Sequence, residues 1–263
     1  MPGRLRRIKH PRRALLALLR RLPLFSSRRC VMCGHALGRF LPYGRGLVDS
    51  APLSLALEVV GSDVENMECP WCGSTDRERH LQLYLQRTGL LSWLAGKRVL
   101  HLAPEKRLAG LLLDGGPALY AAADLAGGPA VDLRFDLAQM PFPDAAFDLV
   151  VANHVLEHVH ALPESLSELH RVLAPGGLAI LQTPFSPVLH TTFEDTGIEV
   201  AEARFHAYGQ DDHVRLFGRD IASIIELAGF TSKMNTHQEV LADVQPADVG
   251  VNPEEPFFLF ERC

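Results

Sequence analysis

Short apolar runs alternate with helix-like segments through the second half of this 263-residue chain, and this alternation limits the fold more than any other feature. Helical spacing of apolar residues precedes the first run and recurs at 163–173 and 221–228, each time with glycines just beyond. Strand–helix alternation folds into parallel sheets covered on both faces. We therefore predict an α/β, doubly wound, mostly parallel sheet. Its seven predicted strands are 98–102, 118–124, 131–136, 147–152, 178–183, 230–234 and 256–262.

Polar residues stand where these predicted strands end, and ligands of doubly wound sheets bind at that edge. Asp124 closes the second strand about twenty residues beyond the first loop, a position suited to accept both hydroxyls of a ribose. A turn or capping role for Asp124 is the alternative. Asp136 closes the third strand and opens a loop suited to wrap an adenine edge. The fourth strand runs into a segment that brings further polar groups to the same edge: Asn153, His154, Glu157 and His158.

Four of the five cysteines form two Cys-x-x-Cys pairs, each followed directly by glycine. Two intervening residues let both thiolates reach one tetrahedral ion, and the glycine permits the turn between them. In a chain without a secretion signal this pattern favours metal over disulfides. We predict a coordinatively closed, structural Zn²⁺ site; two unrelated reduced pairs or a redox pair are the alternatives. Its predicted ligands are Cys30, Cys33, Cys69 and Cys72, whereas Cys263 has no predicted role.

Positive charge is concentrated in residues 1–29, which hold ten of the 26 Lys and Arg residues and no acid. The remainder carries a net charge near −15, which makes it a poor electrostatic match for a long nucleic acid. The apolar run 14–19 in this leader is too short to span a bilayer. The leader is expected to be either a solvated basic helix or tail, or a helix in peripheral contact with an anionic membrane surface. Cytoplasmic residence is the resulting expectation.

Two segments resemble the class I S-adenosylmethionine-dependent methyltransferases of type 11: QMPFPDAAFDLVVANHVLEHV (139–159) and ELHRVLAPGGLAILQTP (168–184). The resemblance spans about 95–235. Further segments resemble a subgroup with a Cys-rich N-terminal module and an APE first loop: FLPYG, CPWCGSTDRERHLQLYL, LHLAPEKRL, TFEDTG and YGQDDHVRLFG. The resemblance implies a Rossmann-like methyltransferase sheet and S-adenosyl-L-methionine as methyl donor.

The first loop departs from the family pattern, which places an acid on the strand and glycines after it. His101 stands at the position of the acid, and Ala103, Pro104 and Glu105 stand where glycines are usual. Ala103 is the next smallest side chain, and Glu105 restores a carboxylate close to the donor's amino group. A degenerate domain without cofactor is the alternative. The predicted cofactor-binding residues are His101, Ala103, Pro104, Glu105, Asp124, Leu125, Asp136, Leu137, Asn153 and His154.

The predicted reaction needs an acceptor aligned with the S–CH₃ bond and, for a hydroxyl or ammonium acceptor, a base. His213, Asp212 and His158 are the predicted catalytic residues, because a histidine beside carboxylates is tuned near neutral pH. His158 is alternatively a support for the cofactor loop, and His213 a partner in a loop hydrogen bond. Arg215 is expected either to bind an anionic group or to pair with Asp211 or Asp212.

These features predict three parts: a basic leader (1–29), a four-cysteine zinc module (30–76) and a methyltransferase domain (77–263) with an aromatic-rich substrate lid at 184–214, or a loop packed on the domain. We expect O- or N-methylation of a small-molecule or glycan acceptor. An RNA base methyltransferase whose zinc module grips RNA is one alternative. A non-catalytic binding protein with a degenerate methyltransferase fold is the other.

Overall fold

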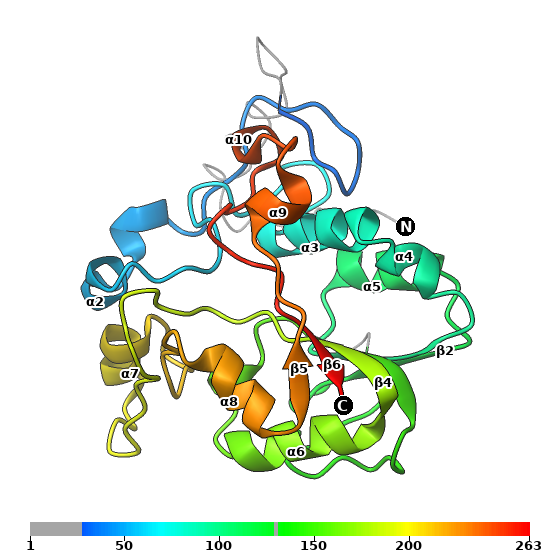
Figure 1. Cartoon of the computed structure of the whole chain (residues 1–263). Coiled ribbons are helices and arrows are strands. Elements are labelled where there is room, and N and C mark those ends of the chain that lie inside the picture. Colours follow the sequence, from blue (N-terminus) through cyan, green and yellow to red (C-terminus); the bar gives the residue numbers. More distant parts are fainter. Residues whose placement is uncertain (1–27, 129–130) are drawn as a thin grey trace, which may run out of the picture.

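The computed structural model describes residues 28–128 and 131–263 (Figure 1), so the predicted basic leader lies almost wholly outside the described residues. The helices are α2 (Pro52–Ala56), α3 (Asp76–Arg87), α4 (Leu90–Trp93), α5 (Lys106–Asp114), α6 (Leu162–Val172), α7 (Ala201–Tyr208), α8 (Ile221–Leu227), α9 (His237–Leu241) and α10 (Pro246–Val249), with the 3-10 helices η1 (Gly46–Asp49) and η2 (Leu156–His158). The strands are β1 (Arg98–Leu102), β2 (Leu119–Ala123), β3 (Phe147–Ala152), β4 (Leu173–Ile180), β5 (Phe230–Ser232) and β6 (Leu259–Arg262).

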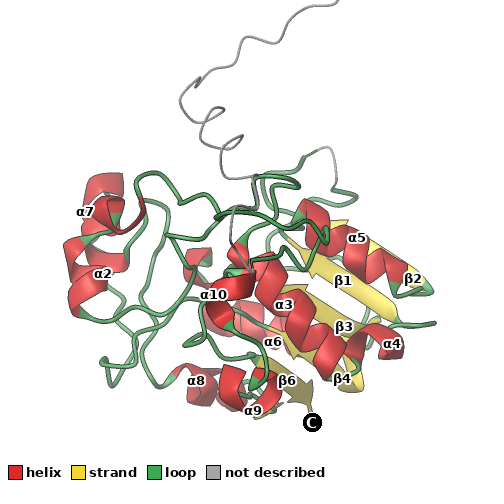
Figure 2. Ribbon diagram, turned by 90° about the horizontal axis from the view of Figure 1, so that it is seen from above, coloured by secondary structure: helices red, strands yellow, loops and turns green. Residues whose placement is uncertain are grey.

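The strands form one mixed sheet in the order β2-β1-β3-β4-β6-β5 (Figure 2). Strands β1 to β4 pair in parallel, and β6 runs antiparallel to both β4 and β5. The α/β, mostly parallel architecture predicted from the alternating pattern is confirmed. Because all parallel strands point the same way, their carboxyl ends meet at one edge of the sheet.

The predicted strand at 131–136 does not form, so the sheet has six described strands and the expectation of seven is wrong. Leu133 makes a single bridge to Ala123 beyond the sheet edge and is 38 % exposed. The Asp132 side chain accepts a hydrogen bond from the Ala122 amide, so it occupies a backbone donor that a further strand would use. The run alternates charged with apolar residues, and its apolar side chains find no covered face of the sheet. It therefore stays irregular at the sheet edge.

Both faces of the sheet are covered by helices, with α6 and α8 on one side and α3, α4 and α5 on the other (Figure 1). Successive side chains of a strand point to opposite faces. Leu100 and Val150 accordingly join the core beneath α6 and α8, whereas Val99 and Leu149 join the core beneath α3 to α5. This burial on both faces explains why the central strands read as continuous apolar runs.

Most element boundaries fall within two residues of those predicted. The largest shift is at β4, which begins at Leu173 and contains the Ala-Pro-Gly-Gly segment that we expected to follow α6 as a loop. Helix α8 ends next to Gly229, whose φ of 98° lies in the left-handed region that a glycine adopts without steric cost.

The Cys-bounded segment is held to the sheet domain by a buried arginine of α3. Arg79 donates to the carbonyls of Ser74 and Asn66 in that segment and to those of Val249 and Gly250 near the C-terminus. Its guanidinium also lies 4.0 Å from the centre of the Phe40 ring.

Along the described part of the chain, no helix is long and apolar enough to cross a membrane.

Candidate functional site

A cavity of about 630 Å³ opens at the carboxyl ends of β1, β2 and β3. This is the edge at which the sequence predicted a ligand site. The cavity is lined by Leu102, Ala103, Ala123, Asp124, Leu125, Ala126, Arg134, Phe135, Asp136, Leu137, His154, Val155, His158, Val159, His160, Ala161 and Asp212. Six of the ten predicted cofactor residues, namely Ala103, Asp124, Leu125, Asp136, Leu137 and His154, belong to this lining. His101, Pro104, Glu105 and Asn153 do not.

The first loop keeps a glycine-like backbone although it has no glycine. Ala103 has a φ of 46°, in the left-handed region that non-glycine residues rarely adopt. Its amide donates to the Ala123 carbonyl at 2.8 Å, which ties the loop after β1 to the end of β2. Only a methyl group therefore stands where the loop borders the cavity.

His101 and Glu105 lie behind this loop in a polar cluster. The Nδ1 atom of the fully buried His101 is 2.8 Å from the Tyr120 hydroxyl, and its Nε2 atom is 3.4 Å from a Glu105 oxygen. Asn153 donates to the other Glu105 oxygen at 2.6 Å. Glu105 thus joins the ends of β1 and β3, and this cluster supports the cavity wall.

Asp124 and Asp136 line the cavity and also stabilise their own turns. Asp124 Oδ1 accepts from the amides of Ala126 and Gly127, and Asp136 Oδ1 accepts from the Ala138 amide. The turn role that we considered as an alternative for Asp124 is therefore real. It uses Oδ1, so the turn itself fixes the direction of the carboxylate that borders the cavity.

His154 is held between two buried carboxylates. Its Nδ1 atom lies 3.2 Å from Glu157 Oε1 and its Nε2 atom 3.3 Å from Glu255 Oε1. Burial and the charge of Arg77 would lower the pKa of His154, but Glu157 and Glu255 outweigh them and raise it. The two carboxylates therefore favour the protonated form of an imidazole that lies in the cavity wall on a backbone with a φ of 54°.

The two carboxylates respond in the opposite sense. Burial would raise the pKa of Glu157, but His154 and the nearby His213 and His158 lower it to about 2. Glu255 behaves alike: burial opposes ionisation, and His154 and His80 hold the pKa below its usual range. The ring of His80 continues this cluster to His237, with 2.9 Å between ring nitrogens.

Sequence reasoning missed Glu255 and His80. Glu255 lies in no recognisable motif and is 101 residues from its partner His154, and the CPWCGSTDRERHLQLYL segment that contains His80 assigned that residue no role. Only the folded chain brings these groups together.

Of the three predicted catalytic residues, His158 and Asp212 reach the cavity and His213 lies behind them. His158 Nδ1 is 3.3 Å from Asp212 Oδ2 and equally far from the Asp212 carbonyl oxygen. His213 is only 3 % exposed, and its ring meets the His158 ring edge-on at 4.7 Å between centres. Burial lowers the pKa of His213.

Arg215 pairs with neither Asp211 nor Asp212 and does not face the cavity. Its fully buried guanidinium is bidentate to Glu194, with both N–O distances 3.0 Å. It also donates to the carbonyls of Leu156 and Val159 in the loop that carries His158. Arg215 therefore clamps segment 184–214 to the loop after β3.

Segment 184–214 reaches the cavity through Asp212. None of the aromatic and histidine side chains that suggested a lid belongs to the cavity lining: Phe185, His190, Phe193, Phe205, His206 and Tyr208. Phe193 packs on Tyr208, and Phe185 packs on Phe258. The alternative of a loop packed on the domain describes these side chains.

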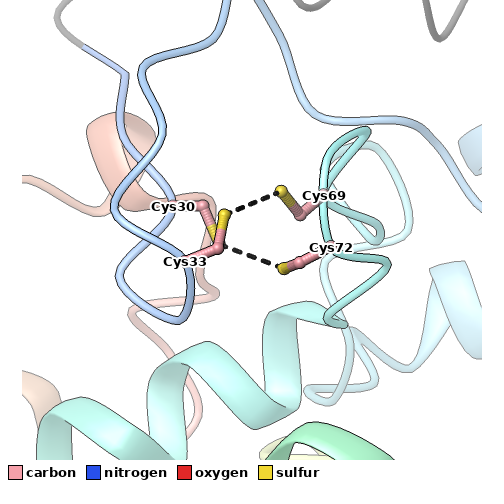
Figure 3. Close-up of side chains that lie close together, drawn as sticks. All are labelled: Cys30, Cys33, Cys69 and Cys72. Atoms are coloured by element: carbon pink, nitrogen blue, oxygen red, sulfur yellow. Dashed lines mark hydrogen bonds between the residues drawn. The ribbon is translucent and has the colours of Figure 1, made fainter.

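The four predicted zinc ligands converge, as Figure 3 shows, with their sulfur atoms all within 4.8 Å of one another. Two sulfur pairs lie 3.8 and 3.9 Å apart: Cys30 with Cys72, and Cys33 with Cys69. The Cys69 thiol, with help from Ser74 and against the effect of burial, lowers the pKa of Cys30 to about 4.

The two Cys-x-x-Cys turns share one backbone design. The amide of Gly34 donates to the Cys30 carbonyl, and the amide of Gly73 donates to the Cys69 carbonyl. Both glycines have a φ of 73°. A side chain at either position would strain the turn, which explains why glycine follows each pair.

Comparison with known proteins identifies one domain family. Residues 96–181 match the family model described as a methyltransferase domain. No curated protein matched the chain. A solved S-adenosylmethionine-dependent methyltransferase from Mesorhizobium loti is 18 % identical, with 67 % of this chain and 96 % of that chain covered and a TM-score of 0.44. The 1,6-didemethyltoxoflavin-N1-methyltransferase of Burkholderia thailandensis is 17 % identical, with 68 % and 78 % covered and a TM-score of 0.43.

Proposed function

We propose that the methyl donor of this S-adenosylmethionine-dependent methyltransferase binds in the cavity at the ends of β1 to β3. The premise is the match of residues 96–181 to a methyltransferase domain. The observation that carries the proposal is the placement of Asp124 and Asp136. Two carboxylates, Asp124 directly after β2 and Asp136 in the loop between β2 and β3, border one cavity whose volume suits a small-molecule ligand.

Different residues of the cavity bind different parts of the donor. Asp124 is placed to accept the ribose hydroxyls, since it closes β2 beside the first loop. Leu125, Asp136 and Leu137 form the wall for the adenine, and Ala103 lets the loop backbone approach the methionine part. His101, Pro104, Glu105 and Asn153 act from behind this wall by fixing the loop. When bound, S-adenosyl-L-methionine supplies a methyl group already activated by its sulfonium.

The acceptor is a small molecule or glycan with an oxygen or nitrogen nucleophile. It enters beside His158 and Asp212, which border the cavity and are its candidate proton acceptors. His213 lies behind His158 and positions it. The protein's chief task is alignment of the acceptor with the S–CH₃ bond.

Calorimetric titration of the full chain with S-adenosyl-L-methionine tests the donor site. Asp124→Ala should weaken binding by about 1–3 kcal/mol, because ribose hydroxyls lose their buried acceptor. Asp114→Ala, which removes an exposed carboxylate at the end of α5, should leave the affinity unchanged. The proposal is wrong if the wild-type chain does not bind, or if Asp124→Ala binds as tightly as wild type.

We also propose that Cys30, Cys33, Cys69 and Cys72 hold a structural Zn²⁺ ion. A tetrahedral ion with Zn–S bonds of about 2.3 Å separates its sulfur ligands by about 3.8 Å, which agrees with the 3.8 and 3.9 Å observed. Four thiolates leave no position open, so the ion would stabilise the module without reaching substrate.

Elemental analysis and thermal unfolding test the zinc site. The purified chain should carry one zinc, and Cys69→Ser should lose the metal and unfold at a lower temperature. Cys263→Ser, which removes the exposed fifth thiol, should keep both properties. A metal-free wild-type chain with unchanged stability would contradict the proposal.

A further inference from the structure

A second group of metal-ligand side chains lies beside the cavity, far in sequence from the cysteines. Glu157, His158 and His213 each place one oxygen or ring nitrogen so that all three atoms lie within 4.8 Å of one another. The first two come from η2 after β3, and the third comes from the segment that precedes Arg215. Two imidazoles and one carboxylate form a recurrent ligand set for divalent transition ions.

The hydrogen bonds of the two imidazoles leave one ring nitrogen of each free to bind an ion. His213 Nδ1 lies 3.2 Å from the Tyr208 carbonyl oxygen, and a carbonyl can only accept. His158 Nδ1 faces the Asp212 carbonyl and carboxylate oxygens in the same way. Both rings therefore carry their proton on Nδ1, and the Nε2 atom of each ring has a free lone pair. Metal-binding histidines are oriented by such contacts to their second nitrogen.

Glu157 supplies a buried negative charge with spare accepting capacity. The residue is 1 % exposed; its Oε2 atom accepts from the Thr183 hydroxyl at 2.9 Å. Its Oε1 atom has no hydrogen-bond partner among the described residues, although His154 Nδ1 lies 3.2 Å away. The contact with His154 is an ion pair without hydrogen-bond geometry, so Oε1 keeps a lone pair that an ion can use.

The backbone holds the three ligands at fixed positions before any ion arrives. The Val214 amide, directly after His213, donates to the Glu157 carbonyl at 2.9 Å. Arg215 then binds the carbonyls on either side of His158 through Leu156 and Val159. A rigid ligand set of this kind loses little entropy on binding an ion.

We propose that Glu157, His158 and His213 bind one divalent first-row transition ion, which holds a hydroxyl oxygen of the methyl acceptor at the cavity wall. Three protein ligands leave coordination positions open, and one of the three, His158, lines the cavity. The ion lowers the pKa of the hydroxyl. With His158 occupied as a ligand, the hydroxyl proton passes to the Asp212 carboxylate. The inference rests on the proposed function and narrows its acceptor to a hydroxyl compound.

Electron paramagnetic resonance with Mn²⁺ tests this inference on the full chain, because Mn²⁺ prefers oxygen and nitrogen over the thiolates of the cysteine cluster. Wild type should bind one Mn²⁺ per chain, and His158→Gln and His213→Gln should each weaken that binding at least about 10-fold. The matched control is His206→Gln, an exposed histidine of the same segment outside the group. If His213→Gln fails to fold, the partly exposed His158 carries the test alone.

Two results would overturn the inference: no Mn²⁺ bound by wild type at millimolar ion, or equal binding by wild type, His158→Gln and His213→Gln. Titration of the same samples with S-adenosyl-L-methionine separates the two proposals. If the chain binds the donor but not Mn²⁺, the metal-site inference is wrong and the proposed function stands. If the chain does not bind the donor, the proposed function itself is wrong.

Discussion

The two walls of the cavity are built in different ways. At the ends of β1 and β2, the wall consists of short turns in which Asp124 and Asp136 hydrogen-bond to amides only two or three residues further along the chain. At the loop after β3, His154 and His158 are held by partners at distant positions, namely Glu255 and Asp212. One wall is organised by local backbone geometry and the other by contacts between residues far apart in the sequence, of which the His154–Glu255 pair is buried.

This difference predicts different sensitivities. Local turns re-form after a substitution because their partners are close in sequence, so changes in the first wall should affect ligand affinity more than stability. The buried network loses a charge partner with every substitution, and an uncompensated buried charge is expensive. Changes in the second wall should therefore affect folding first.

The largest effect is expected for Arg215→Met. The substitution keeps much of the buried volume but leaves two buried loop carbonyls and the partly exposed Glu194 without their donor, which should lower the free energy of unfolding by about 3–5 kcal/mol. Urea unfolding measures it. Arg204→Met, which removes a less buried arginine from α7 of the same segment, is the control and should cost less than about 1 kcal/mol. If both variants lose the same free energy of unfolding, the contacts of Arg215 contribute no more to stability than those of Arg204.

A smaller effect with a defined pH dependence is expected for Glu255→Gln. Because the pKa of Glu255 is lower in the folded than in the unfolded chain, its ionised form stabilises the fold above the unfolded pKa of about 4.5. The variant should lose about 2–3 kcal/mol near pH 7. That loss should shrink as the pH falls below about 4.5, because the unfolded wild-type chain then binds a proton at Glu255 that the folded chain, with its lower pKa, does not bind.

Unfolding curves at a series of pH values measure this dependence. Glu254→Gln, the exposed neighbouring glutamate, should match wild type throughout. A loss that is constant with pH would mean that Glu255 contributes through packing rather than charge.

The smallest effect is expected in the first wall, for Ala103→Gly. Glycine adopts a φ of 46° without the Cβ strain of alanine, so the free energy of unfolding should rise, by no more than about 1 kcal/mol. The matched comparison is Ala109→Gly within α5, where the same change should cost about 1 kcal/mol. A destabilised Ala103→Gly chain would show that the loop is not strained.

Much of the fold could be predicted because its signals are local. Strands β1 and β3 were predicted to the residue, since continuous apolar runs bounded by loops identify buried parallel strands. The convergence of the four cysteines was predicted correctly, because each Cys-x-x-Cys-Gly segment encodes its own turn. The run 131–136 has similar local signals, but it has no neighbour to cover its outer face, and covering depends on tertiary structure.

The candidate site divides in the same way. Asp124 could be placed by counting to the end of β2, because the carboxyl ends of parallel strands share one edge. Asp136 also lines the cavity, although the strand that it was predicted to close does not form. The aromatic side chains of 184–214 that suggested a lid lie outside the cavity lining, since composition does not say which side of a loop faces a cavity. His213 was expected at the site and lies one side chain behind it for the same reason.

By itself, the amino-acid sequence determined the strand alternation, the cysteine turns and the acid at the end of β2, because each depends on residues within a few positions of one another. Tertiary structure alone decided which charges neutralise each other: Glu255 with His154, and Arg215 with Glu194. A buried charge is stabilised only by a partner a few ångströms away in space, and distance along the chain carries no information about that partner.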